Sequence, residues 1–224
     1  MISYQYFAFL DVLGYKKLLE HDVKNNEVVF KDKLVKAFRV FDDVNQTDFT
    51  YKSISDSILI RCTAETPIFA FFVLLKKVFI SFLKADLLIR GGVAYNQHFE
   101  NTNITYSKAI ADAYDIEQKQ SIYPRIVIAD SVISMAKTNK QLERIKKAKL
   151  LLKDGNLFQL NIIDNANWVI VFKLVKQLYT SNAQEIDSDP ALRAKYSWFQ
   201  NYLFSKKPAK INKIRFLADF EELE

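Results

Sequence analysis

Two aspartates near the start of the chain have neighbours that suit metal chemistry. Asp11 follows the apolar run 6–10, which predicts a buried strand, and Gly14 then opens an amphipathic helix. Ligands bind at the carboxyl ends of strands in open α/β sheets, and helix N-termini attract anions. Asp11 therefore indicates a divalent cation that holds a nucleoside triphosphate. The alternative is that Asp11 is only an N-cap, a position that Asp often takes.

The second aspartate, Asp56, lies in a predicted hairpin. Residues 51–60 form two short strand patterns around the turn Ser-Asp56-Ser, with Ile58 and Ile60 alternating with other residues. If this hairpin pairs beside the first strand, its carboxylate faces that of Asp11. Two Mg²⁺ ions about 3.5–4 Å apart need shared carboxylates of this kind.

Three further elements must position this site. The apolar strand 87–95 contains Arg90-Gly91-Gly92, and glycine inside a strand usually marks a bulge or a close backbone approach. A helix is predicted for 106–117, with Ala109, Ala113 and Ile116 on one face. Another strand is expected from Arg125 onward.

Taken in order, these stretches resemble the class III nucleotide cyclases. The resemblance covers roughly residues 4 to 160 and is carried by FLDVLGYKKL, SISDSILI, LIRGGVAY, SKAIADAYDIE and YPRIVI. The chain is most similar to the compact bacterial branch that makes cyclic pyrimidine nucleotides in the Pycsar anti-phage defence system. No single motif is decisive, whereas the ordered set is fairly specific.

The resemblance implies a function and a set of site residues. A pyrimidine cyclase converts UTP or CTP into 3′,5′-cyclic UMP or CMP and pyrophosphate, uses two Mg²⁺ or Mn²⁺ ions, and is a homodimer with its active sites at the interface. Asp11 and Asp56 match the metal-binding aspartates. The remaining matches are the Val12 carbonyl as a metal ligand, Val12, Leu13, Gly14 and Tyr15 as the phosphate cradle, and Tyr51, Lys52 and Ser53 as the region that reads the base.

The chain also departs from the family pattern. Ala111 and Asp115 stand where class III cyclases usually carry an Asn and an Arg, and Ser107 replaces a glycine. The cation that stabilises the transition state is therefore unassigned, with Arg90, Lys108 and Arg125 as candidates. Of these, Arg90 is taken as the catalytic residue together with the two aspartates. A degenerate cyclase that binds nucleotide without turnover is the first rival function.

Composition narrows the remaining function classes. The net charge of +6 fits a nucleotide ligand, and it leaves a palm-like nucleic-acid-binding protein as a second rival. We expect no nucleic-acid partner, because no zinc-finger, RNP or helix-turn-helix signature is present. His21 and His98 lack a third ligand in register, so a zinc site is not expected. The single cysteine, Cys62, is interpreted as a core residue.

The sequence predicts an α+β fold with a ferredoxin-like class III cyclase core. This core has an antiparallel-rich central sheet with flanking helices. We expect one domain, 1–224, with its core at about 4–160 and a helical extension at about 165–224. No uncharged run is long enough for a membrane span and no signal peptide is evident, which predicts a cytoplasmic protein. Local predictions are a loop at 21–26, a type I′ turn at Asp154-Gly155, a helix opened by Asp189-Pro190, and a last helix within 211–224.

Overall fold

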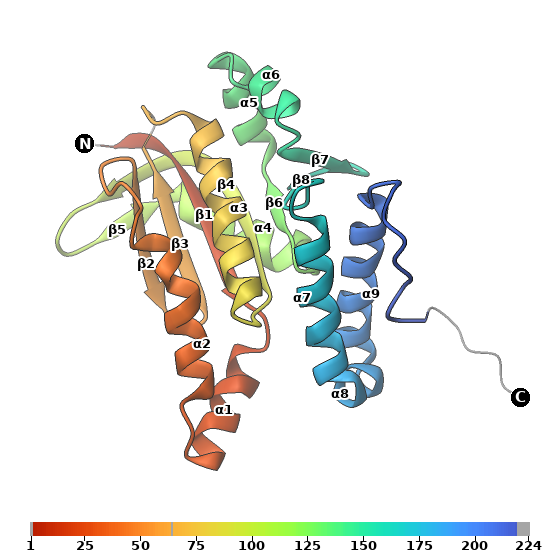
Figure 1. The fold of residues 1–224 in the computed structure, drawn as a ribbon. Coiled ribbons are helices and arrows are strands. Elements are labelled where there is room, and N and C mark those ends of the chain that lie inside the picture. Colours follow the sequence, from red (N-terminus) through yellow and green to blue (C-terminus); the bar gives the residue numbers. More distant parts are fainter. Residues whose placement is uncertain (1, 64, 219–224) are drawn as a thin grey trace, which may run out of the picture. The chain divides into compact units, whose positions relative to one another are not determined.

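The computed structural model describes residues 2–63 and 65–218. It is a mixed α+β structure, as predicted, with a multistranded sheet flanked by helices (Figure 1). Internal contacts divide the chain into two compact units, Met1–Ile162 and Ile163–Glu224. The expectation of a single cyclase-like domain with a helical extension stays a prediction.

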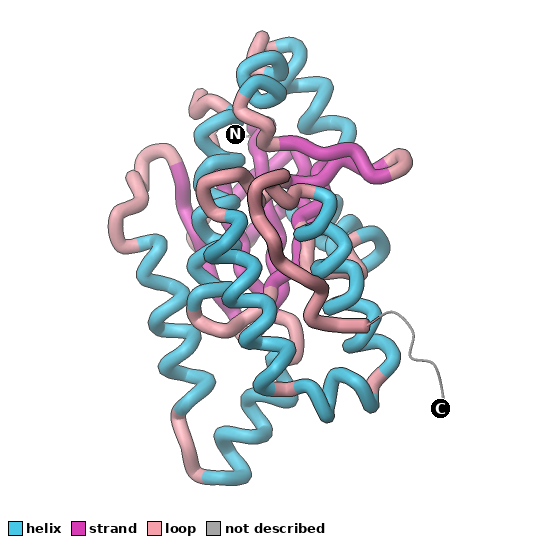
Figure 2. The backbone as a smooth tube through the Cα atoms, turned by 45° about the vertical axis from the view of Figure 1, so that its right-hand side comes forward, coloured by secondary structure: helices cyan, strands magenta, loops and turns pink. Residues whose placement is uncertain are grey.

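One sheet organises the first unit (Figure 2). Its main path runs in the order β2-β3-β1-β4-β6-β8-β7, and β5 pairs with β4 off this path. β4 and β6 are parallel, and the other neighbours are antiparallel. The strands are β1 (Ser3–Val12), β2 (Phe49–Ile54), β3 (Ser57–Cys62), β4 (Ile89–Glu100), β5 (Thr105–Ser107), β6 (Ile126–Ile128), β7 (Leu151–Asp154) and β8 (Leu157–Leu160).

Helices cover both faces of this sheet, with α2 and α3 on one face and α4 on the other (Figure 1). Phe7 of β1 packs against Ala109 and Ala113 of α4. On the other face, Tyr51 of β2 stacks on Phe41. The helical segments of this unit are α1 (Tyr15–Asn25), α2 (Val29–Phe38), the 3₁₀ helix η1 (Arg39–Phe41), α3 (Ile68–Lys84), α4 (Lys108–Gln120), α5 (Asp130–Thr138) and α6 (Leu142–Lys147).

β1 lies inside the sheet because it pairs with β3 on one side and with β4 on the other. A strand in this position is covered on both faces, which explains the continuous apolar run that precedes Asp11. Tyr6, Ala8 and Leu10 are at most 1% exposed. Cys62, which pairs with Tyr6, is also fully buried, so its predicted place in the core is confirmed.

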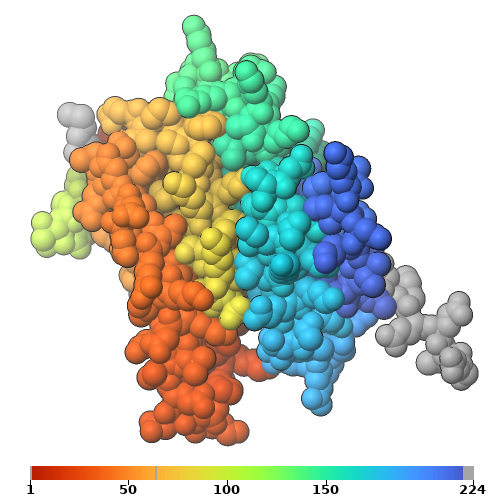
Figure 3. Space-filling view, in the orientation of Figure 1, coloured from red at the N-terminus to blue at the C-terminus, as the bar shows by residue number. Residues whose placement is uncertain are grey.

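The predicted loop at 21–26 is wrong, since α1 continues to Asn25. No glycine or proline interrupts this stretch, and the helix ends only where Asn26 takes a left-handed conformation with φ 53°. Asp22 is buried here and accepts a hydrogen bond of 2.9 Å from the backbone N–H of Phe30 in α2. α1 and the start of α2 form an exposed end of the first unit (Figure 3).

The predicted hairpin between β7 and β8 is present, but its turn is not type I′. Asp154 pairs with Leu157, so Gly155 and Asn156 are the central turn residues. A type I′ turn needs positive φ at both positions, whereas here Gly155 has φ +58° and Asn156 does not have a positive φ.

The second unit is helical and consists of α7 (Trp168–Ser181), α8 (Ala183–Ser188), α9 (Pro190–Ser205) and the segment that follows them. Asp189 caps α9 by accepting backbone hydrogen bonds from Ala191 and Leu192, and Pro190 begins the helix, as predicted. Trp168 is fully buried and donates a 2.7 Å hydrogen bond to the carbonyl of Leu203.

The predicted last helix is absent from residues 211–218, and the rest of that prediction, 219–224, lies outside the described residues. Gln200 of α9 explains the non-helical course. Its side chain is fully buried, accepts backbone hydrogen bonds from Phe216 and Leu217, and donates one to the Leu217 carbonyl. These bonds occupy backbone groups that a helix would use internally. Over the described part of the chain, none of the helices combines the length and the apolarity required to cross a membrane.

Candidate functional site

Asp11 lies one residue before the end of β1 and pairs with Ser57 of β3 and Arg90 of β4. Side chains alternate along a strand, so Asp11 shares with Phe7 the sheet face that α4 covers. Its side chain is 16% exposed. Arg90 lies on the same face and donates a hydrogen bond of 3.0 Å from Nε to Asp11 Oδ2.

Asp56 lies in the turn between β2 and β3, beside the end of β1. The backbone N–H of Val12 donates a 3.0 Å hydrogen bond to the Asp56 carbonyl, which ties this turn to the strand that carries Asp11. Burial raises the pKa of Asp11 above its ordinary value, the ion pair with Arg90 opposes this rise, and the Asp56 carboxylate adds to it. The structure therefore brings the two predicted aspartates together.

The predicted phosphate cradle forms the turn from β1 into α1. Val12 is buried, and the backbone N–H of Leu13 is hydrogen bonded to the segment that enters β4. Gly14 is the N-cap residue and has φ +78°, a conformation that disfavours other residues. Tyr15 begins the helix, and no side chain of the described residues caps its N-terminus. The first N–H groups of α1 are thus placed to meet an anion.

The predicted base-reading region is divided between the two faces of the sheet. Lys52 pairs with Leu59, which pairs with Phe9, so Lys52 shares the face of Asp11. Its Nζ forms an ion pair with Glu100. Tyr51 and Ser53 alternate to the opposite face, where the ring of Tyr51 stacks on η1. Of these three residues, Lys52 alone lies on the sheet face of Asp11, and its ammonium group is held by Glu100.

The three candidate cations have different partners. Arg90 contacts Asp11, as described above. Lys108 pairs with Asp112 one helical turn away. Arg125 is 8% exposed and bonds Asp154 at 2.8 Å, joining β6 to the hairpin β7–β8. Arg90 is therefore the candidate that the structure brings to the aspartates.

Glu117 of α4 is a site residue that the sequence analysis missed. It is fully buried, and its Oε1 lies 2.7 Å from Arg90 Nε. Burial raises the pKa of Glu117, Arg90 opposes the rise, and the charges of Asp11 and Asp56 add to it. The helical spacing could have indicated its position, because Glu117 lies four residues after Ala113 and therefore on the apolar stripe of the helix.

The residues at the family's usual Asn and Arg positions lie on a different side of α4. Ala111 and Asp115 are both exposed. Asp115 pairs with Lys119 on the same helix at 3.1 Å. In this chain, the charged side chain that α4 turns toward Asp11 is therefore that of Glu117.

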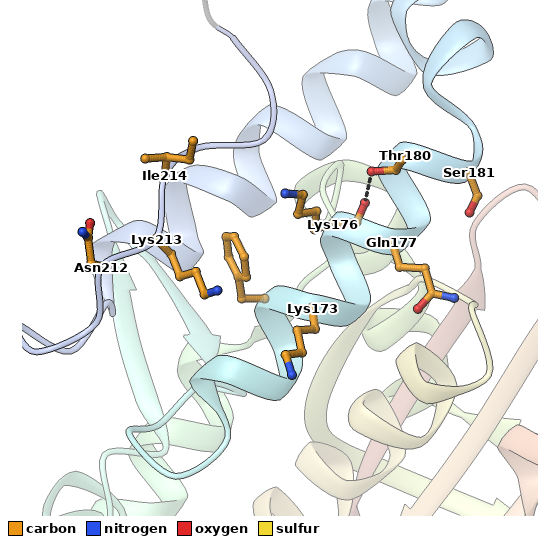
Figure 4. Close-up of a pocket in the computed structure, with 9 residues that line it drawn as sticks. Lys173, Lys176, Gln177, Thr180, Ser181, Asn212, Lys213 and Ile214 are labelled. Atoms are coloured by element: carbon orange, nitrogen blue, oxygen red, sulfur yellow. Dashed lines mark hydrogen bonds between the residues drawn. The ribbon is translucent and has the colours of Figure 1, made fainter.

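Other polar clusters lie elsewhere in the described part of the chain. His21, Asp22 and Glu27 have ligand atoms within 4.8 Å of one another. Because Asp22 already binds the start of α2, this cluster has a structural explanation. In the second unit, α7 and the segment 212–214 line a pocket with three exposed lysines, Lys173, Lys176 and Lys213 (Figure 4).

Comparison with known proteins finds likeness in structure alone. No protein-family model matches the sequence, and no curated protein sequence matches it. A bacterial light-regulated adenylyl cyclase is 14% identical with a TM-score of 0.48, covering 80% of this chain and 99% of that chain. The guanylyl cyclase domain of the RhoGC fusion protein from the aquatic fungus Blastocladiella emersonii is 9% identical with a TM-score of 0.48, covering 71% and 96%. The adenylyl cyclase CyaB from P. aeruginosa is 13% identical with a TM-score of 0.44, covering 72% and 96%. The function proposed next therefore rests on the side chains of the site.

Proposed function

We propose that the chain is a nucleotide cyclase that converts UTP or CTP into a 3′,5′-cyclic nucleotide and pyrophosphate. The observation that carries this proposal is the convergence of Asp11 and Asp56 at the turn that begins α1. Carboxylate oxygens are the ligands that Mg²⁺ and Mn²⁺ prefer. The N–H groups of the helix start favour phosphate. This donor set fits a triphosphate held through divalent cations.

In this proposal each residue has a separate task. Asp11 and Asp56 hold two ions, which when bound lower the pKa of the ribose 3′-hydroxyl and neutralise phosphate charge. The backbone around Gly14 orients the phosphates through N–H groups. Arg90 places a positive charge beside them, where it can stabilise negative charge that develops during the transfer. Positioning and electrostatics supply most of the rate.

Substrate choice and assembly extend the proposal. Of the predicted base-reading residues, Lys52 shares the face of Asp11, so we expect Lys52 to contact the base. The pyrimidine preference, the homodimer with sites at its interface and the signalling role in anti-phage defence come from the sequence resemblance. Product identification from an equimolar mixture of ATP, GTP, CTP and UTP tests the pyrimidine preference directly.

The cyclase assignment is tested with Asp11→Ala and Asp56→Ala, assayed for cyclic product with Mn²⁺ and each NTP. Each substitution removes a metal ligand and with it several kcal/mol of transition-state stabilisation. The rate of cyclisation should therefore fall by about 10³-fold or more. Asp11→Ala should still fold, because Arg90 keeps Glu117 as its partner. Asp32→Ala, which removes an exposed carboxylate of α2, is the control and should retain full activity. Substantial turnover by either site variant would contradict the assignment.

Nucleotide binding without turnover is the second candidate function. It is favoured by Ala111 and Asp115, which leave the exposed side of α4 without the Asn and Arg of active class III enzymes. Calorimetric binding of a non-hydrolysable NTP, together with absence of cyclic product for all four NTPs, would establish this alternative.

A further inference from the structure

The side chain of Glu117 is fully buried on the apolar stripe of α4. Buried carboxylate oxygens nearly always receive hydrogen bonds, because losing water without a replacement is costly. Glu117 Oε2 receives one of 2.6 Å from Gln118. Within the described residues, Oε1 receives none. This oxygen is therefore an unsatisfied acceptor, and it lies beside the Arg90 Nε atom that bonds Asp11.

Arg90 lies close to this oxygen without satisfying it. The Nε atom of Arg90 is 2.7 Å from Glu117 Oε1 and 3.0 Å from Asp11 Oδ2. Nε carries one hydrogen, and that hydrogen is donated to Asp11. A well-formed Arg–carboxylate pair is usually bidentate, with one N–H for each oxygen. Here one nitrogen is shared by two carboxylates.

The charge balance at this point favours a second cation. Asp11, Asp56 and Glu117 interact electrostatically with one another. Arg90, which contacts Asp11 and Glu117, supplies one positive charge against these three carboxylates. Buried negative charge in excess of its counter-charge is unfavourable, and a divalent cation with oxygen ligands removes that excess.

We propose that Glu117 is a third ligand of the divalent-cation site, and that one cation binds where Arg90 Nε now lies, between Asp11 and Glu117. Mg²⁺ binds oxygen at about 2.0–2.1 Å. From the distances of 2.7 and 3.0 Å, both oxygens would need to close by less than about 1 Å. Arg90 then turns away from Asp11 toward the phosphates. This inference rests on the proposed function, because it completes the same metal site.

The test is Mn²⁺ binding to the full chain without nucleotide, measured by electron paramagnetic resonance. Glu117→Gln keeps the shape of the side chain and removes its charge, and should weaken Mn²⁺ binding by about 10–100-fold. Asp11→Asn should weaken it at least as much. Asp115→Asn, an exposed change on the same helix, is the control and should match the wild type. Circular dichroism checks that each variant is folded.

A double variant separates a ligand from a residue that acts only by holding Arg90. Arg90→Gln should bind Mn²⁺ more tightly than the wild type, because it removes the competing charge. In that background, Glu117→Gln should still weaken binding, and an unchanged affinity there would overturn the inference. Binding lost in Asp11→Asn but kept in Glu117→Gln would refute the third ligand while leaving the proposed function intact. A wild-type protein that binds no Mn²⁺, with or without nucleotide, would refute both.

Discussion

Replacing Gly92 by alanine tests how α4 is held against the sheet. A Cβ atom built on Gly92 would lie 2.3 Å from the carbonyl oxygen of Ala113 and 2.7 Å from Cβ of Ile116. Ordinary contacts of a Cβ atom begin at about 3.4 Å. Because the nearest atom belongs to the helix backbone, no side-chain rotation relieves the clash. The helix as a whole would have to move outward by about 1 Å.

The loss of folding free energy in Gly92→Ala can be estimated from that displacement. Inserting a methyl group into a packed interface typically costs about 1–3 kcal/mol, and a backbone clash belongs at the upper end. About 3 kcal/mol lowers the ratio of folded to unfolded protein by roughly 100-fold. The same movement carries Glu117 away from Arg90. A misplacement of about 1 Å can also cost about 10²-fold in activity, so stability and function should both fall.

Urea unfolding followed by circular dichroism measures the loss, with a lower midpoint and an unchanged m-value expected. Gly155→Ala is the matched control. A Cβ atom at this position meets nothing within 4 Å, so the substitution causes no steric clash. Its only cost is the backbone strain of an alanine at φ +58°, about 1–2 kcal/mol. Gly155→Ala should leave Mn²⁺ binding unchanged, whereas Gly92→Ala should weaken it. Wild-type stability and Mn²⁺ affinity in Gly92→Ala would refute the close approach of α4 to β4.

Two further predictions concern buried groups of the first unit. Burial raises the pKa of the Cys62 thiol to about 12, so the reactive thiolate is scarce at pH 8. Iodoacetamide should leave Cys62 unmodified in the native protein and alkylate it in urea, as read by intact mass. Arg125→Met should lower the free energy of unfolding by about 1–3 kcal/mol, because Arg125 bonds Asp154 and the Gln120 carbonyl. An unchanged urea midpoint would show that these bonds contribute little.

Local signals in the sequence were sufficient for the elements that carry the aspartates. The apolar run before Asp11 predicted a buried strand, which is β1, and Gly14 has the positive φ that the turn from this strand into α1 favours. The hairpin around Asp56 is also present, and Asp189 with Pro190 opens α9. Each of these features depends on a few neighbouring residues. Such features can be predicted before the rest of the fold is known.

Features that depend on distant residues could not be read in the same way. Tyr51, Lys52 and Ser53 are adjacent in sequence, but strand alternation sends Lys52 alone to the face of Asp11. Glu117 looks like a surface residue until the packing of α4 on the sheet is known. The end of the chain was predicted as helix, although Gln200 from α9 takes up the backbone groups of that segment.

The Arg90-Gly91-Gly92 motif links these observations. A Cβ on Gly91 would meet Leu10 Cδ2 at 2.4 Å, whereas one on Gly92 would meet α4. Successive strand residues face opposite sides, so the two glycines admit close neighbours on both faces of β4. Next to them, Arg90 is the cation that Asp11 and Glu117 share. The motif thus explains why a carboxylate on a helix reaches a strand-end aspartate: without a side chain at Gly92, α4 packs close enough for Glu117 to enter the site.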